Sequence, residues 1–232
     1  MKKASYSLPK ILSAFKIEAL NPMQEASIAA SKEHDNIILL SATGSGKTLA
    51  FLLPVAERLD VNNKTTQALF IVPSRELALQ IEQVFRSMAT GFKVTCCYGG
   101  HLRETEENNL LEAPALIIGT PGRLADHIRR GNIKLAGIET LVLDEFDKSL
   151  EFGFEEEMSF VVNSLPAVKK RMLVSATESA EMPRFIRLKD AVTLNFLTGE
   201  PTEALAIQLV KSPDADKLET LFRLVCYLGN RS

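Results

Sequence analysis

The chain has 232 residues, of which 46% are hydrophobic and 24% are charged, and its formal net charge is −2. The length allows one large α/β domain, with or without an appendage, and the composition is typical of a globular protein. The net charge excludes a protein that attracts nucleic acid through a high overall positive charge. The three cysteines are odd in number and suggest no disulfide framework, which favours a reducing compartment. Neither a leader after Met1 nor an apolar run of membrane-spanning length is found, so we expect a cytoplasmic protein.

In chain order, two helices separated at Asn21-Pro22 are expected before the first strand. After them, short apolar runs typical of buried strands alternate with segments of helical spacing. Strands are expected at Ile37–Leu40, Ala68–Val72, Val94–Tyr98, Leu116–Gly119, Leu141–Leu143, Met172–Ser175 and Val192–Leu194, and helices at Leu8–Phe15, Gln24–Ser31, Leu49–Leu53, Glu76–Met88, Glu104–Leu111, Arg123–Arg130 and Phe154–Ser164. This alternation predicts an α/β fold, with a doubly wound, mainly parallel sheet and helices on both faces.

The last part of the chain has a different character. We expect residues 1–197 to form one domain, residues 198–203 a linker, and residues 204–232 the opening of a second domain that this chain does not contain. A strand over Ala204–Val210 and a helix over Asp216–Tyr227 are expected there. One strand and one helix cannot bury a core of their own.

A nucleotide phosphate site is predicted where the first buried strand runs into a Gly/Ser/Thr-rich loop. Gly44 and Gly46 allow the backbone N–H groups of this loop to point inward, and the helix that follows adds its positive N-terminal end. Lys47 is placed to reach the phosphates, and the Thr48 hydroxyl to hold Mg²⁺. A Gly/Ser turn with an exposed lysine is the alternative, and it does not explain why Lys47 and Thr48 open a helix directly after a strand.

A second cluster lies at the end of the strand Leu141–Leu143, where Asp144 and Glu145 follow one another. Carboxylate oxygens suit a hard cation such as Mg²⁺. An adjacent carboxylate can orient or deprotonate the water that attacks a γ-phosphate.

Further segments complete a recognisable order along the chain. They are Pro22-Met23-Gln24, Ser41–Thr48, Pro73-Ser74-Arg75-Glu76-Leu77-Ala78, Gly99-Gly100, Thr120-Pro121-Gly122-Arg123, Asp144-Glu145-Phe146-Asp147 and Ser175-Ala176-Thr177. In this order they resemble the adenine-recognising Q motif, phosphate loop, PTRELA, paired glycines, TPGR, DEAD and SAT segments of DEAD-box RNA helicases. The resemblance runs from about Phe15 to the end and covers that family's ATP-binding lobe, a RecA-like P-loop domain.

The resemblance implies an RNA-dependent ATPase that uses ATP and Mg²⁺ and remodels or unwinds RNA duplexes. It assigns the adenine edge to Gln24 and the phosphates to Ser41, Ala42, Thr43, Gly44, Ser45, Gly46, Lys47 and Thr48. Catalysis is assigned to Glu145, Lys47 and Asp144, with Thr48 and Asp144 as Mg²⁺ ligands. Coupling of the nucleotide to the second lobe is assigned to Asp147, Ser175 and Thr177.

The resemblance also implies an RNA surface that reads the backbone and not the base sequence. Its residues would be Ser74, Arg75, Gly99, Gly100, Thr120, Gly122 and Arg123. Glycines allow close approach to phosphates, helix N-termini attract them and arginines pair with them. The expected partners are therefore RNA and a second helicase lobe, with no membrane and no oligomer.

Departures from the family pattern leave other readings open. Ile17 stands where the family has an aromatic residue that stacks on adenine, and Leu20-Asn21 replaces Pro-Thr. Ser41 stands where the phosphate-loop pattern usually has Gly, and Phe146 replaces Ala. An ATP-gated RNA clamp with negligible turnover is one alternative, and a DNA-directed helicase of the same superfamily is another. The three histidines, His127 among them, have no ligand spacing, so no metal cluster is expected. The acidic residues of Glu104–Glu107 are expected on a solvated helix face, and Phe152 and Phe154 in the core.

Overall fold

The computed structural model of the chain describes residues 6–100, 102–177, 183–197, 209–213 and 216–229. The chain divides into two compact units, Met1–Thr198 and Gly199–Ser232. The predicted linker, 198–203, and most of the predicted strand Ala204–Val210 lie outside the described residues, while Leu209 and Val210 belong to no strand. In the described part of the chain, no helix combines the length and apolarity that crossing a bilayer requires.

Every strand predicted between residues 37 and 194 is present, and the observed bounds depart only slightly from the expected ones. The strands are β1 (Asn36–Ser41), β2 (Ala68–Ile71), β3 (Val94–Cys97), β4 (Leu116–Gly119), β5 (Thr140–Asp144), β6 (Lys170–Ser175) and β7 (Val192–Phe196). The helices are α1 (Leu8–Phe15), α2 (Pro22–Glu33), α3 (Lys47–Arg58), α4 (Arg75–Ser87), α5 (Arg103–Leu111), α6 (Pro121–Arg129), α7 (Phe146–Glu151), α8 (Glu155–Asn163) and α9 (Leu218–Leu228), with short 3-10 turns η1 (Leu135–Gly137) and η2 (Arg184–Ile186).

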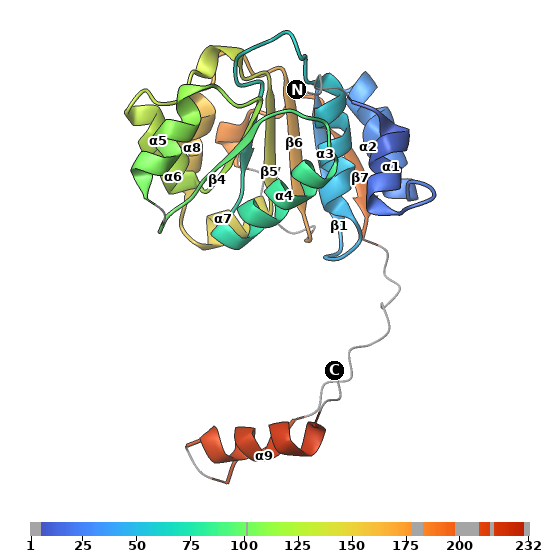
Figure 1. Ribbon diagram of the computed structural model, residues 1–232, viewed down its shortest axis with the longest axis vertical. Helices are drawn as coiled ribbons and strands as arrows, with labels where there is room; N and C mark the ends of the chain where they lie inside the picture. The colour runs from blue at the N-terminus through green and yellow to red at the C-terminus, as the bar shows by residue number, and fades with distance from the viewer. Residues whose placement is uncertain (1–5, 101, 178–182, 198–208, 214–215, 230–232) are drawn as a thin grey trace. The chain divides into compact units, whose positions relative to one another are not determined.

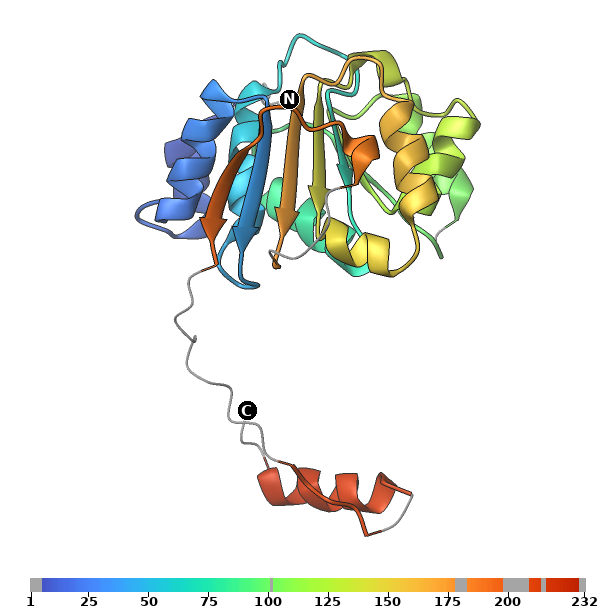
Figure 2. The ribbon, with the colours of Figure 1, turned by 180° about the vertical axis from the view of Figure 1, so that it is seen from behind.

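The strands form a 7-stranded sheet in the order β3-β4-β2-β5-β6-β1-β7. Each pairing is parallel, so all strands end at the same edge of the sheet. Helices α3 and α4 lie in front of the strands in Figure 1 and behind them in Figure 2, which is turned by 180°. The predicted doubly wound parallel fold is confirmed.

Each face of the sheet carries its own hydrophobic core, because successive side chains of a strand point to opposite faces. In β2, Ala68 and Phe70 pack into one core with side chains of α1 to α4. Leu69 and Ile71 pack into the other core with side chains of α5 to α8. Burial on both faces explains why these strands read as continuous apolar runs.

Phe146, the departure from the family's Ala, is fully accommodated by the second core. Its ring is 2% exposed and packs with residues such as Leu143 and Met158. Phe154 packs against the same core, as predicted. Phe152 is 60% exposed, so its predicted burial is wrong. It is the C-cap residue of α7.

We expect Phe146→Ala to lower the free energy of unfolding by about 3–5 kcal/mol. Removing the buried ring loses the favourable free energy of transferring it out of water and leaves a cavity in the core. Urea unfolding followed by circular dichroism measures the change. Phe152→Ala removes the same atoms from an exposed position and should change stability by about 0.5 kcal/mol or less. Equal losses in the two variants would contradict the packing described for Phe146.

Candidate nucleotide and RNA site

The predicted phosphate loop connects β1 to α3 at the carboxyl edge of the sheet. Gly44 has φ 82°, and Gly46, the N-cap of α3, has φ 90°. Both values favour glycine, since side chains rarely adopt this left-handed conformation. The hydroxyl groups of Ser41 and Ser45 form a hydrogen bond across the loop, with their oxygen atoms 2.5 Å apart. The loop therefore has the backbone freedom and the helix N-terminus that a phosphate site needs.

Helix α2 holds this loop from the side through its first turn. Asn21 and Gln24 form a capping box, in which each side chain accepts a hydrogen bond from the other residue's backbone N–H. The Asn21 amide also donates to the Ser45 carbonyl at 3.0 Å, and the Gln24 amide donates to the Gly46 carbonyl at 3.3 Å. A Cβ at Gly46 would lie 2.9 Å from Gln24 Nε2, so a side chain here would have to displace the Gln24 amide.

Two opposite charges are buried beside the loop without hydrogen-bond partners in the described part of the chain. They are the Lys47 ammonium group and Oδ1 of Asp144 at the end of β5. Burial raises the pKa of Asp144 to about 7, and the positive charge of Lys47 opposes that rise. Unpaired buried polar atoms are costly. The Mg²⁺ and phosphate groups expected from the sequence would satisfy both atoms. Thr48, the second residue of α3, is half-buried next to them.

Glu145 follows Asp144 in a left-handed conformation, with φ 48° and ψ 45°. Such a conformation is uncommon for a residue with a side chain and often marks a functional site. Lys148 Nζ donates to Glu145 Oε2 at 2.8 Å. The bend at Glu145 ends β5 and starts α7.

The predicted coupling residues are in direct contact. Asp147 Oδ2 accepts hydrogen bonds from the Ser175 hydroxyl at 3.0 Å and from the Thr177 hydroxyl at 2.9 Å. The Ser175 hydroxyl also accepts from the Thr177 backbone N–H at 3.0 Å. This cluster links the start of α7 to the end of β6, the strand next to β5.

Two of the predicted RNA segments meet at Tyr98, the residue after β3. The Arg75 guanidinium lies 5.0 Å from the centre of the Tyr98 ring, at the N-terminus of α4. Ser74 is the N-cap of that helix and accepts a hydrogen bond from Leu77 N–H. A Cβ added at Gly99 would meet no atom within 4 Å beyond its chain neighbours, and Gly100 has φ 78°. The space beside Gly99 is therefore open to a ligand.

The third predicted RNA segment reaches Tyr98 from β4. Thr120 is the N-cap of α6, and the Cβ position of Gly122 faces open space. Arg123 Nε donates to the Tyr98 carbonyl oxygen at 3.1 Å and lies 3.4 Å from Glu106 Oε2. The backbone around Tyr98 thus brings the predicted RNA residues of three different strand ends together.

The strand order separates the two halves of the site. Segments predicted to hold RNA follow β3, β4 and β2. The predicted phosphate, Mg²⁺ and catalytic residues follow β1 and β5, and the predicted coupling residues follow β5 and β6. All of them lie at the carboxyl edge, where ligands bind in open α/β sheets.

The sequence of this chain is similar to those of known proteins. Residues 21–186 match the sequence profile of the family described as "DEAD/DEAH box helicase". The chain belongs to this family. The resemblance inferred from the motifs is therefore confirmed for the greater part of the chain.

Relatives in this family include two bacterial proteins. The chain is 35% identical to the ATP-dependent RNA helicase CshA of Limosilactobacillus reuteri, over 95% of this chain and 46% of that protein. It is 37% identical to the DEAD-box ATP-dependent RNA helicase CshA of Geobacillus kaustophilus, over 75% of this chain and 38% of that protein. The chain thus spans less than half the length of these relatives.

A solved DEAD-box structure shows the same fold. The DEAD box protein of Methanococcus jannaschii superposes with a TM-score of 0.71 at 31% identity. The superposition covers 80% of this chain and 53% of that one.

The sequence patterns did not reveal a buried group beside the predicted RNA segments. Glu106 is 1% exposed, so the prediction that the acids of Glu104–Glu107 all face solvent is wrong for this residue. Cys97, Glu106 and His127 each offer a possible metal-ligand atom, and these atoms lie within 4.8 Å of one another. Their spacing along the chain gives no sign of this grouping. The signal for Glu106 is its position four residues before Leu110, which places both on the inner face of α5.

We expect Asn21→Ala to lower the free energy of unfolding by about 1–2 kcal/mol, because it removes a helix cap and the bond to the phosphate loop. It should also weaken ADP binding, measured by calorimetry, since the loop loses a support. Ser7→Ala is the matched control, because Ser7 caps α1 without a side-chain hydrogen bond. Reduced stability with unchanged ADP affinity would show that Asn21 acts on α2 alone.

Proposed function

We propose that this chain is the ATP-binding and ATP-hydrolysing lobe of an RNA-dependent ATPase that remodels or unwinds RNA duplexes. The observation that carries the proposal is the pair of buried, unpartnered groups, Lys47 Nζ and Asp144 Oδ1, beside a glycine loop at a helix N-terminus. Buried groups of opposite charge that each keep an unpartnered polar atom suit a ligand that carries both phosphate and metal charge. The family's name and those of the relatives support the same activity.

In this proposal each group at the nucleotide half has one task. Lys47 and the loop amides bind the phosphates, and Thr48 and Asp144 hold Mg²⁺, which neutralises phosphate charge when bound. Glu145 orients the attacking water and accepts its proton. Asp147, Ser175 and Thr177 report the state of the nucleotide to a second lobe.

Gln24 is the proposed adenine reader, and its amide is already engaged by the loop and by the Asn21 backbone. Binding adenine therefore requires the Gln24 side chain to exchange or share these bonds. The protein will prefer adenine over guanine nucleotides if only an adenine edge can replace the hydrogen bonds that the Gln24 side chain gives up. Separate calorimetric titrations with ADP and GDP test the role, and equal affinities would contradict it.

One observation favours slow turnover as a second candidate. The Glu145 carboxylate is held by Lys148 at 2.8 Å. If this ion pair persisted in the ATP complex, the protein would act as an ATP-gated RNA clamp. Phosphate release with and without RNA separates a clamp from an efficient ATPase.

Lys47→Ala should abolish nucleotide binding, because no other lysine begins α3 at the phosphate loop. Glu145→Gln should leave binding intact and remove turnover, since it deletes the basic carboxylate and spares Asp144. Binding is measured by calorimetry on this chain, and turnover with a second lobe supplied in cis or in trans. Glu151→Gln makes the same charge change at an exposed position of α7 and should keep both. Normal hydrolysis by Glu145→Gln would remove Glu145 from the mechanism.

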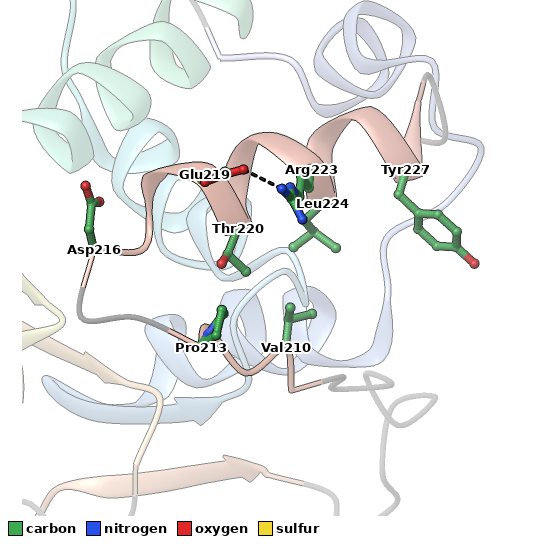
Figure 3. Close-up of a pocket in the computed structure, with 8 residues that line it drawn as sticks. All are labelled: Val210, Pro213, Asp216, Glu219, Thr220, Arg223, Leu224 and Tyr227. Carbon is green, nitrogen blue, oxygen red and sulfur yellow. Dashed lines mark hydrogen bonds and ion pairs between the residues drawn. The ribbon is translucent and has the colours of Figure 1, made fainter.

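The unit Gly199–Ser232 supports the presence of a second lobe in the working enzyme. The apolar residues of α9 recur at helical spacing and are exposed, among them Leu218, Leu221, Phe222 and Val225. A hollow of about 710 Å³ lies between α9 and the segment that contains Val210 and Pro213, with Leu224 directed toward it (Figure 3). An apolar helix face of this kind normally packs against further structure. We infer that the rest of a second lobe covers it.

Alone, residues 1–232 should bind nucleotide but show barely detectable ATPase, no stimulation by RNA and no duplex unwinding. An arginine finger contributes roughly 10³–10⁵ in rate for phosphoryl transfer, and we place that arginine on the second lobe. Adding the lobe in cis or in trans should restore RNA-stimulated phosphate release. Robust RNA-stimulated hydrolysis by this chain alone would refute the two-lobe proposal.

A further inference from the structure

Glu106 is a buried carboxylate at the junction of the predicted RNA segments. Its side chain is 2% exposed, and α5 carries it under the turn that follows β3. Glu106 Oε1 accepts a hydrogen bond from the Tyr98 backbone N–H at 3.1 Å. A buried charge is retained at a free-energy cost unless hydrogen bonds satisfy it. The partners of Glu106 therefore indicate what the carboxylate is there to hold.

The other oxygen of Glu106 faces the only arginine of the TPGR segment. Glu106 Oε2 lies 3.4 Å from Arg123 Nε, and the same Nε donates to the Tyr98 carbonyl oxygen at 3.1 Å. The backbone N–H and C=O of Tyr98 are thus held by Glu106 and by Arg123. Gly99 and Gly100 follow immediately, so the course of the glycine turn depends on the same two side chains.

His127 fixes the carboxylate from behind. Its Nδ1 lies 3.0 Å from Asn132 Nδ2, an amide nitrogen that can only donate, so Nδ1 accepts and Nε2 carries the proton. Nε2 consequently donates to Glu106 Oε2 at 2.7 Å. Asn132 is itself oriented by Glu107, which accepts from the same amide at 3.2 Å.

We propose that Glu106 is a positioning residue for RNA binding: it orients Arg123 and the turn from Tyr98 to Gly100 so that separate strand ends present one surface to the RNA backbone. This proposal rests on the proposed function and adds a residue outside the segments that resemble the family's motifs. The Arg75 guanidinium lies 5.0 Å from the centre of the Tyr98 ring, so Arg75 also contacts the residue that Glu106 and Arg123 hold. Orienting these groups before RNA arrives lowers the entropy that binding must otherwise spend on ordering them.

The same contacts disfavour a metal in the cluster of Cys97, Glu106 and His127. A metal needs a lone pair on a histidine nitrogen, and both nitrogens of His127 are engaged in the hydrogen bonds just described. The nearby Arg123 side chain adds a positive charge that opposes a cation.

The test compares Glu106→Gln with Glu104→Gln, which makes the same charge change at an exposed position of α5. Binding of a fluorescent single-stranded RNA to the whole chain is followed by anisotropy at low salt. Glu106→Gln offers an NH₂ group to two donors, so it should weaken RNA binding about tenfold, the effect of losing one charge-assisted contact. The slope of log affinity against log salt should fall by about 0.7, the value for one single-strand phosphate contact. ADP affinity should stay the same in both variants.

A double-mutant cycle shows whether Glu106 acts through Arg123. If it does, Glu106→Gln combined with Arg123→Gln should weaken RNA binding by less than the product of the two single losses. Independent losses, or a Glu106→Gln variant that binds RNA as well as or better than the wild type, would overturn the positioning role. If the wild-type chain binds no RNA, either alone or with a second lobe supplied in cis, the proposed function on which this role rests is rejected instead.

Two measurements on the wild type keep the proposal testable if Glu106→Gln does not fold. The Arg123 Nε–H should give a slowly exchanging NMR signal, since it is hydrogen-bonded and shielded; a rapidly exchanging signal would contradict the arrangement. Stoichiometric Zn²⁺ should leave Tm unchanged. A clear rise in Tm would make the cluster a metal site and overturn the positioning role.

Discussion

The parallel direction of all strands is the constraint on which the site depends. In a parallel sheet every strand ends at one edge, so loops that are far apart in the chain meet there. The order β3-β4-β2-β5-β6-β1-β7 then decides which loops become neighbours. It groups the glycine turn, Ser74-Arg75 and the TPGR segment in one half, and the phosphate loop, Asp144 and Ser175 in the other. The border between β2 and β5 separates the predicted RNA segments from the predicted nucleotide segments.

The buried charged groups of the two halves differ in whether they have hydrogen-bond partners. In the nucleotide half, Lys47 and Asp144 are buried with atoms that have no hydrogen-bond partner among the described residues. In the predicted RNA half, the carboxylate of Glu106 accepts hydrogen bonds from Tyr98 and His127 and lies 3.4 Å from Arg123 Nε. An unsatisfied pair gains most from a ligand that brings the missing charge, whereas a satisfied group gains from staying in place. The first arrangement suits binding and chemistry, and the second suits a rigid surface.

The sequence predicted the elements well because strand burial on both faces leaves continuous apolar runs, and because the motifs lie at strand ends. It could not predict which strands are neighbours, since pairing of β2 with β5 joins segments about seventy residues apart in the chain. Glu106 was missed because acidic residues surround it and only its spacing from Leu110 marks the inner face of α5. The prediction that Phe152 is buried was wrong because an aromatic residue at a helix end can be exposed, and nothing in the neighbouring sequence indicates this.

The departures from the family pattern are met by local compensation in the structure. Asn21 replaces a threonine and still caps α2, and its longer amide also reaches the Ser45 carbonyl. Ser41 stands where the phosphate loop usually has glycine, and its hydroxyl closes the loop against Ser45. Both changes add hydrogen bonds between the loop and its surroundings. A loop held more tightly before ATP binds needs less ordering on binding, so these substitutions can offset part of the stacking energy that Ile17 does not supply.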